Sequence, residues 1–101
     1  MAPRLDLQAL LVNLLGSDNV YFQPPPSLQM QYPCIVYNIE RMRTEFANDK
    51  PYTIDKSYQV TVIDRDPDST IPEMVAKLPK CIHERFFAAE NLNHNVFRLF
   101  F

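Results

Sequence analysis

Apolar and polar residues alternate most regularly in the middle of the chain, between residues 57 and 63. The apolar positions there are Tyr58, Val60 and Val62. This period of two places three β-forming side chains on one face of an extended strand. Pro67 lacks a backbone N–H and ends the run. One apolar and one half-polar face predict an antiparallel sheet, covered on one side and open to water or another chain on the other.

The same alternation predicts further strands around this one. They span residues 20–23, 33–43 and 94–101. Residues 81–88 fit either a helix or a strand, and we predict a strand because Pro79 ends the preceding helix and a second hairpin with residues 94–101 then follows. A turn cluster at residues 48–51 joins two of the strands, so residues 33–45 and 53–64 should form a long hairpin. The far end of this hairpin is too polar to be covered by the chain's own core. It either reaches a neighbouring subunit as an arm or is simply solvated.

Two segments follow the helical period instead. Residues 3–15 carry four leucines at helical spacing: Leu7, Leu10, Leu11 and Leu14. Gly16 follows, at the position where a residue in the left-handed conformation commonly ends a helix. A second, short helix is predicted over residues 70–78. Thr70 and Glu73 have the spacing of a capping box, and Pro79 stops the helix. The predicted fold is α+β, with one mainly antiparallel sheet of four or five strands, both helices on one face, and a long β-hairpin arm.

Length and composition fit one domain spanning residues 1–101. One glycine against nine prolines favours a stiff fold and excludes glycine-rich phosphate loops. A net charge of −2 argues against a protein that binds nucleic acid tightly, because it has no excess of basic residues that could displace counterions from the phosphates. The sequence contains no apolar run long enough to span a membrane and no signal peptide, which predicts a protein made in the cytoplasm.

Candidate chemistry is weak throughout. The alternate aspartates that begin at Asp64 resemble the opening of a calcium loop, but Ser69 replaces its glycine and Val75 its bidentate glutamate. His83 and His94 have no metal-ligand spacing with either cysteine, and a buried free thiol is the ordinary role for both cysteines. We therefore expect no catalytic, cofactor-binding or metal-binding residues. A non-catalytic binding module that uses the aromatic residues is an open alternative.

Five segments, taken in order, resemble tail terminator (tail completion) proteins of long-tailed bacteriophages. They are YFQPP (21–25), YPCIVY (32–37), NDKPY (48–52), YQVTVIDRDPD (58–68) and NLNHNVF (91–97). None of them is a chemical motif, so the resemblance lies in the ordered set. The small neck proteins of such phages are similar to one another, and a head–tail joining (head-closure) role is the alternative within the same virion.

The resemblance implies a virion structural protein and not an enzyme. Its subunits would form a homohexameric ring that caps the tail tube, ends tail polymerisation and meets the head-side connector or stopper protein. DNA would pass through the lumen without specific binding, and no cofactor or membrane would be involved.

Exposure and charge, together with the aromatic C-terminus, suggest which residues lie between subunits. Leaving a large apolar side chain in water costs roughly 1.5–3 kcal/mol, so Phe100 or Phe101 should be buried against this fold or a partner. The predicted interface residues are Arg41, Arg43, Glu45, Asp49, Lys50, Asp55, Phe100 and Phe101.

Overall fold

The computed structural model describes residues 3–47 and 50–101, with side chains described for residues 4–40 and 56–101. Five strands form one sheet in the order β1-β2-β3-β5-β4. Strands β1 and β2 are parallel, and the other neighbouring pairs are antiparallel. The elements are α1 (Pro3–Leu15), β1 (Val20–Phe22), β2 (Cys34–Ala47), β3 (Lys50–Asp64), α2 (Ile71–Ala76), β4 (Cys81–Ala89) and β5 (Leu92–Phe100). The predicted α+β fold with two helices and a long hairpin is confirmed.

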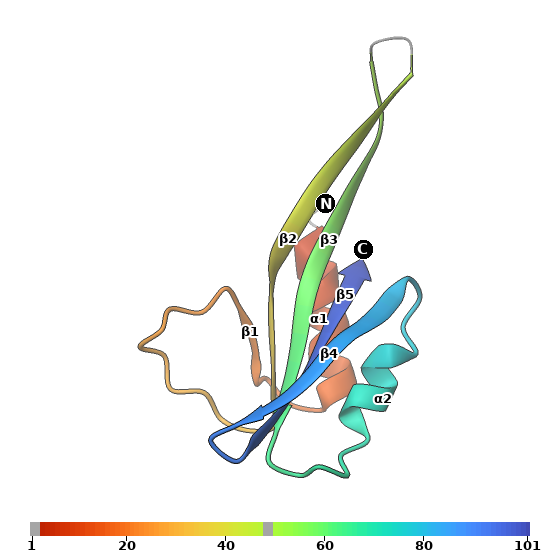
Figure 1. Ribbon diagram of the computed structural model, residues 1–101. Coiled ribbons are helices and arrows are strands. Elements are labelled where there is room, and N and C mark those ends of the chain that lie inside the picture. The colour runs from red at the N-terminus through yellow and green to blue at the C-terminus, as the bar shows by residue number, and fades with distance from the viewer. Residues whose placement is uncertain (1–2, 48–49) are drawn as a thin grey trace.

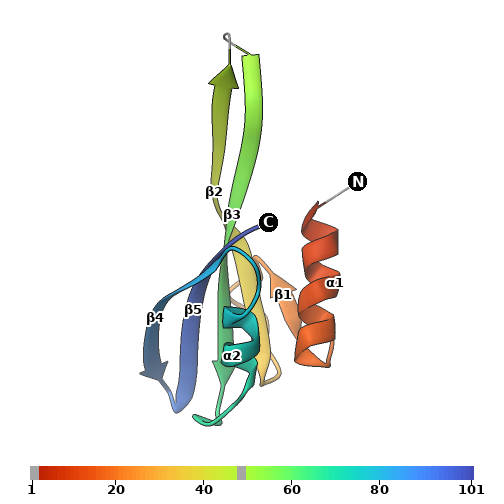
Figure 2. The same cartoon turned by 90° about the vertical axis from the view of Figure 1, so that its right-hand side faces the viewer.

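Both helices lie on the same side of the sheet (Figures 1 and 2). The apolar positions of β3 predicted from the alternation, Tyr58, Val60 and Val62, are fully buried beneath them. The core is completed by one stripe from each neighbouring element: Leu7, Leu11, Val20, Ile35, Tyr37, Val75, Phe97 and Leu99. The leucine stripe of α1 therefore faces the sheet, although its member Leu10 is 36% exposed.

Polar contacts fix α1 in place beside its apolar stripe. The Tyr37 hydroxyl donates to the Gln8 side-chain oxygen, and the Gln8 amide nitrogen donates to the Val20 carbonyl at 3.2 Å. Gly16 has a φ of +81°, and its N–H donates to the Val12 carbonyl at 2.9 Å. The predicted left-handed end of the helix is thus confirmed, and the turn sends the chain into β1.

The parallel pairing of β1 with β2 explains the proline-rich segment between them. Two adjacent parallel strands need a connection that returns to the starting end, which a tight turn cannot provide. Residues 23–33, which include three consecutive prolines, make that return as an irregular loop. The loop is tied down where the Gln31 N–H donates to the Tyr21 hydroxyl at 3.2 Å.

The two hairpins differ in how they end. Residues Glu90 and Asn91 join β4 to β5 and have φ values of 54° and 62°, as a two-residue type I′ turn requires. The predicted hairpin near the C-terminus is therefore confirmed. The β2–β3 hairpin is far longer, with paired positions from Cys34↔Ile63 to Ala47↔Lys50.

The second helix corrects one sequence prediction. It is shorter than expected, and the Thr70 side chain makes no capping hydrogen bond. The residue has φ −86° and ψ −8°, which is already helical backbone, whereas a capping threonine needs an extended conformation. The Ser69 hydroxyl instead accepts from the Ile71 N–H at 3.3 Å. The capping box predicted for Thr70 and Glu73 is wrong.

The last strand, β5, begins two residues earlier and ends one residue earlier than the predicted range of 94–101. Phe97 and Leu99 stand two positions apart on β5 and so share one face, and each is only 1% exposed. Phe100 is 37% exposed and Phe101 is 45% exposed. Neither side chain is buried against the chain's own fold, and burial against a partner stays a prediction.

Candidate interaction surface

The far half of the β2–β3 hairpin projects beyond the sheet as a two-stranded ribbon, and we call residues 42–47 and 50–55 the arm (Figure 1). Strand β5 pairs with β3 only from Ser57↔Phe100 to Asp64↔Asn93, and β1 pairs with β2 only between Ile35 and Tyr37. Within the described chain, no third strand borders the arm. The molecule is accordingly elongated, with extents of 51 × 24 × 23 Å.

A ribbon of this kind leaves backbone donors and acceptors unpaired along both outer edges. Two strands alone are marginally stable in water, because they have no third strand and no covered apolar face. The arm is therefore the part of the fold that gains most from a partner.

The predicted charged interface residues belong to this hairpin. In the backbone register, Arg43 stands opposite Asp55, and Lys50 stands opposite Ala47 at the end of the arm. The side chains of Arg41, Arg43, Glu45, Lys50 and Asp55 lie outside the described side chains, and Asp49 lies outside the described residues. Their role at an interface stays a prediction.

The two terminal phenylalanines lie at the base of the arm. The Phe101 N–H donates to the Lys56 carbonyl at 3.3 Å, and Phe100 pairs with Ser57. The fold therefore brings together the predicted aromatic and hairpin parts of the interface, which are more than 40 positions apart in sequence. Both rings keep more than a third of their surface exposed there.

Strand β4 is a second exposed element, and the sequence reasoning missed it. It is the last strand of the sheet, and every residue after Cys81 in it is exposed. Three of these residues are large and apolar: Ile82 is 55% exposed, Phe86 54% and Phe87 39%. The adjacent phenylalanines were visible in the sequence, but alternation alone does not reveal which strand lies at an edge.

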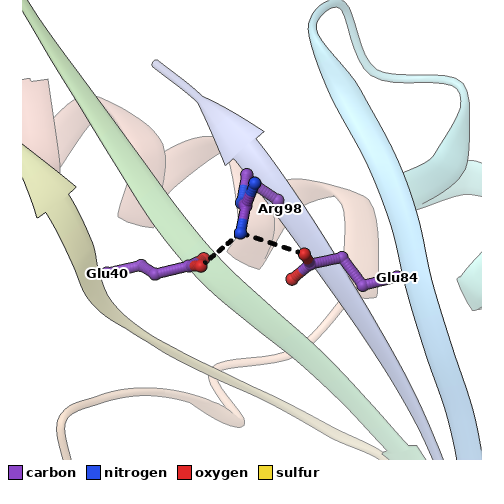
Figure 3. Close-up of polar contacts among 3 residues, drawn as sticks. All are labelled: Glu40, Glu84 and Arg98. Carbon is purple, nitrogen blue, oxygen red and sulfur yellow. Dashed lines mark hydrogen bonds and ion pairs between the residues drawn. The ribbon is translucent and has the colours of Figure 1, made fainter.

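The sheet face opposite the helices carries an ion-pair cluster across three strands (Figure 3). One guanidinium nitrogen of Arg98 on β5 lies 2.8 Å from a Glu40 carboxylate oxygen and 3.1 Å from one of Glu84. The hydrogen bond to Glu40, followed by the charges of both carboxylates, raises the pKa of Arg98. The three side chains are 27–35% exposed, so the cluster is a partly hydrated tie between β2, β5 and β4.

Aromatic stacking extends this face towards the β4–β5 turn. The Phe87 and His94 rings stack with centroids 4.5 Å apart, and the Arg85 guanidinium lies 5.3 Å from the Phe87 centroid. These contacts use one face of each ring and leave Phe87 partly exposed.

The thiols are poor nucleophiles. Burial, and then the charge of Asp64, raises the pKa of Cys34 from its ordinary value of 9.0 to about 11, and burial also raises the pKa of Cys81. Both cysteines are free. Because the thiolate is the reactive form, neither side chain is activated at neutral pH.

The histidines contact neutral partners. His83 Nε2 lies 3.2 Å from the Asn95 side-chain oxygen, and His94 Nδ1 lies 3.2 Å from the Leu92 carbonyl. Among the described side chains, those of residues 4–40 and 56–101, no three metal-ligating groups of the histidine, cysteine or carboxylate kind gather. The aspartates at the end of β3 and just after it accept from the backbone instead: Asp64 accepts from the Asp66 N–H at 3.0 Å, and Asp66 accepts from the Asp68 N–H at 2.9 Å.

A shallow, open hollow of about 620 Å³ lies at the end of α1, lined by residues such as Val12, Asn13 and Asp18. No charged cluster or unpaired buried group faces it among the contacts described. Neither helix, over the described residues, has the length and apolar character needed to cross a membrane. The features that distinguish this surface are therefore the arm, the terminal phenylalanines and the β4 edge.

Comparison of the sequence with models of known protein families and with curated proteins finds no match.

Proposed function

We propose that this protein is a structural subunit of a bacteriophage virion that forms a ring on the end of the tail tube. In this role the ring ends tail polymerisation and offers a surface to the head-side connector. The expected assembly is a homohexamer in the tail or neck, with DNA passing through its lumen. The ordered resemblance of five segments to tail terminator proteins motivates the proposal.

The observation that carries the proposal is the unpartnered arm. Its two strands have open backbone edges on both sides, and the exposed phenylalanines lie at its base. A projecting element of this kind is well suited to contact a neighbouring copy. When the donating and accepting surfaces of a chain differ, repeated contacts are head-to-tail and close into a ring if the rotation permits.

Electrostatics are consistent with a passage for DNA. A chain with a net charge of −2 has no excess of basic residues with which to hold phosphates. We accordingly expect no measurable affinity of the assembled protein for duplex DNA at physiological salt. Filter binding or fluorescence anisotropy would measure it.

Electron microscopy of particles assembled without this protein tests the role directly. Overlong tails that lack heads are expected for a terminator, because nothing stops the tube. Tails of normal length beside unjoined, filled heads would instead assign the head–tail joining role. Complementation with the intact gene is the control, and normal infectious particles without the protein would contradict both roles.

Oligomeric state is the second test. Light scattering coupled to size-exclusion chromatography should detect a species with the mass of six protomers, and negative-stain images should show rings. A monomer of 11.8 kDa both alone and on isolated tail tubes would contradict ring formation. That result would favour the alternative function, a monomeric, non-catalytic binding module.

A further inference from the structure

We propose that the free edge of β4 is a strand-addition site, occupied by the arm of a second copy of this chain. The inference deepens the proposed function, because it names the contact that would join neighbouring subunits of the ring. Its starting point is the backbone N–H and C=O groups that have no partner strand within the chain described. Over the described residues, β1 and β4 are the outer strands of the sheet, but β1 has only three residues. The two longer unpaired edges lie along the arm and along β4.

The β4–β5 turn fixes which backbone groups of β4 point outward. A two-residue type I′ turn closes on a hydrogen-bonded pair, here Ala89↔Leu92. Antiparallel pairs then alternate between bonded and non-bonded positions. The N–H and C=O groups of Ala88 and Phe86 consequently point away from β5, towards the free edge.

The other end of β4 gives the same assignment independently. The Phe100 N–H donates to the Lys80 carbonyl at 3.1 Å, which marks a bonded pair just before the strand begins. Cys81 and His83 therefore present their backbone groups to the free edge. A register shift between His83 and Arg85 interrupts the run, so residues 85–89 form its uninterrupted part.

Apolar side chains flank this part of the edge. Phe86 and Phe87 point to opposite faces of the sheet and remain 54% and 39% exposed. Strand addition combines backbone hydrogen bonds with side-chain contacts on alternate positions, so a strand seated on β4 would cover part of both rings. Burial of this kind offsets the cost of leaving them in water.

The arm of a second copy matches what this edge needs. Each arm strand has six described residues, about 20 Å at ~3.4 Å per residue, which is enough to pair along residues 85–89. The arm is already extended, so less conformational entropy is lost than when a disordered segment binds. Its projection beyond the sheet lets it reach a neighbour.

Pairing of β4 with β4 of a second copy is the competing arrangement. It would be a twofold contact that stops at two chains and leaves both edges of the arm open. Pairing of the arm with β4 uses two different surfaces, satisfies the β4 edge and one edge of the arm, and continues from chain to chain. The arm is therefore the occupant that the two open edges favour.

A matched pair of variants at Ala88 tests the site. Ala88→Pro removes an outward N–H and keeps the bonds to β5, whereas Ala88→Thr keeps that N–H and suits a strand. Light scattering should show the wild type and Ala88→Thr as oligomers and Ala88→Pro as the 11.8 kDa monomer. Circular dichroism should give all three the same spectrum, and Phe86→Lys provides a second variant if the proline change unfolds the chain.

Hydrogen exchange on the intact protein identifies the occupant. On concentration from monomer to oligomer, peptides covering residues 85–89 and the arm should gain protection together, by tenfold or more. Protection of β4 without the arm, in a dimer, would overturn the inference in favour of β4–β4 pairing. Unchanged assembly of both Ala88→Pro and Phe86→Lys, or a wild type that stays monomeric at every concentration, would also overturn it.

These outcomes separate the inference from the proposed function. Rings that survive both β4 variants would remove the strand-addition site and leave the terminator role standing. Rings lost in both variants, from a protein whose removal leaves tails of normal length, would support the contact and remove the terminator role.

Discussion

The two halves of β3 show how differently one strand can be stabilised. Residues 57–64 lie between β2 and β5 beneath the helices, and Tyr58, Val60 and Val62 there are fully buried. Residues 50–55 continue the same strand but pair only with β2. The first half is completed by its own chain, whereas the second is not. We call the described chain outside the arm the body. The proposed role needs both parts, a body that folds alone and an arm with open backbone edges.

The difference predicts that stability resides in the body. Phe97→Ala empties a fully buried position on β5 and should lower the free energy of unfolding by about 3–5 kcal/mol. Domains of this kind are stable by only about 5–15 kcal/mol, so a large part of the native state should be lost on mild heating. Urea unfolding followed by circular dichroism measures the change.

Phe86→Ala is the matched control for that experiment. It removes the same ring from a position that is 54% exposed, and in dilute, monomeric protein it should cost about 0.5 kcal/mol or less. Equal losses at the two positions would mean that β4 is part of the core and not a free edge.

Cys34 tests the body on the sheet face away from the helices. Its thiol is fully buried, and burial raises its pKa to about 11 from an ordinary 9.0. A raised thiol pKa means that the folded state holds the neutral form. The contribution of Cys34 to the free energy of unfolding is therefore fully present below pH 9 and is lost as the pH rises from 9 to 11. We expect the loss to be about 1–3 kcal/mol, because one unit of difference in pKa between the folded and unfolded states is worth about 1.4 kcal/mol.

Comparison with Cys34→Ala isolates this term. Tyrosines and lysines titrate in the same range, but they are common to both proteins. The difference in unfolding free energy between wild type and variant should shrink between pH 9 and 11. A difference that stays constant would place the Cys34 thiol in contact with water.

Local patterns predicted the body well because its packing is periodic. Alternation identified the buried face of β3, and leucine spacing identified the buried face of α1 with Leu7 and Leu11 at its centre. Gly16 marked the helix end because the left-handed conformation it adopts is strained for other residues. Each of these inferences depends on neighbours within a few positions.

Local sequence patterns do not predict the order of the strands in the sheet or the conformation of a helix cap. A period of two is the same for an edge strand and a central one, so nothing in residues 81–89 revealed that β4 borders solvent. The capping box failed because its spacing was right and the Thr70 backbone conformation was not. The interface residues remain a prediction, since charge patterns show exposure and not which chain covers it.

Removing the arm should affect assembly far more than folding. Replacing residues 44–54 with Asn-Gly would close the hairpin on the Arg43↔Asp55 pair with a favoured two-residue turn. This pair is hydrogen-bonded, because the next residue, Lys56, points its carbonyl to β5, where it accepts from the Phe101 N–H. Because no third described strand borders the arm, the free energy of unfolding should change by about 1 kcal/mol or less. Light scattering should show the loss of the oligomer. A loss of stability near that of Phe97→Ala would instead make the arm part of the folding unit.

The smallest effect is expected where body and arm meet, at the ion pairs of Arg98. Arg98→Met breaks the contacts with Glu40 and Glu84 but keeps an apolar side chain of similar length. All three side chains are partly hydrated, so the attraction is weakened by water and screened by salt. Stability at high salt should match the wild type, and the modest advantage of the wild type should appear only at low salt. Arg98→Lys, which keeps the charge without the fork, should fall between them. If Arg98→Met were as damaging as Phe97→Ala at every salt concentration, the open face of the sheet would have to be counted as core, and the contrast between body and arm would lose its basis.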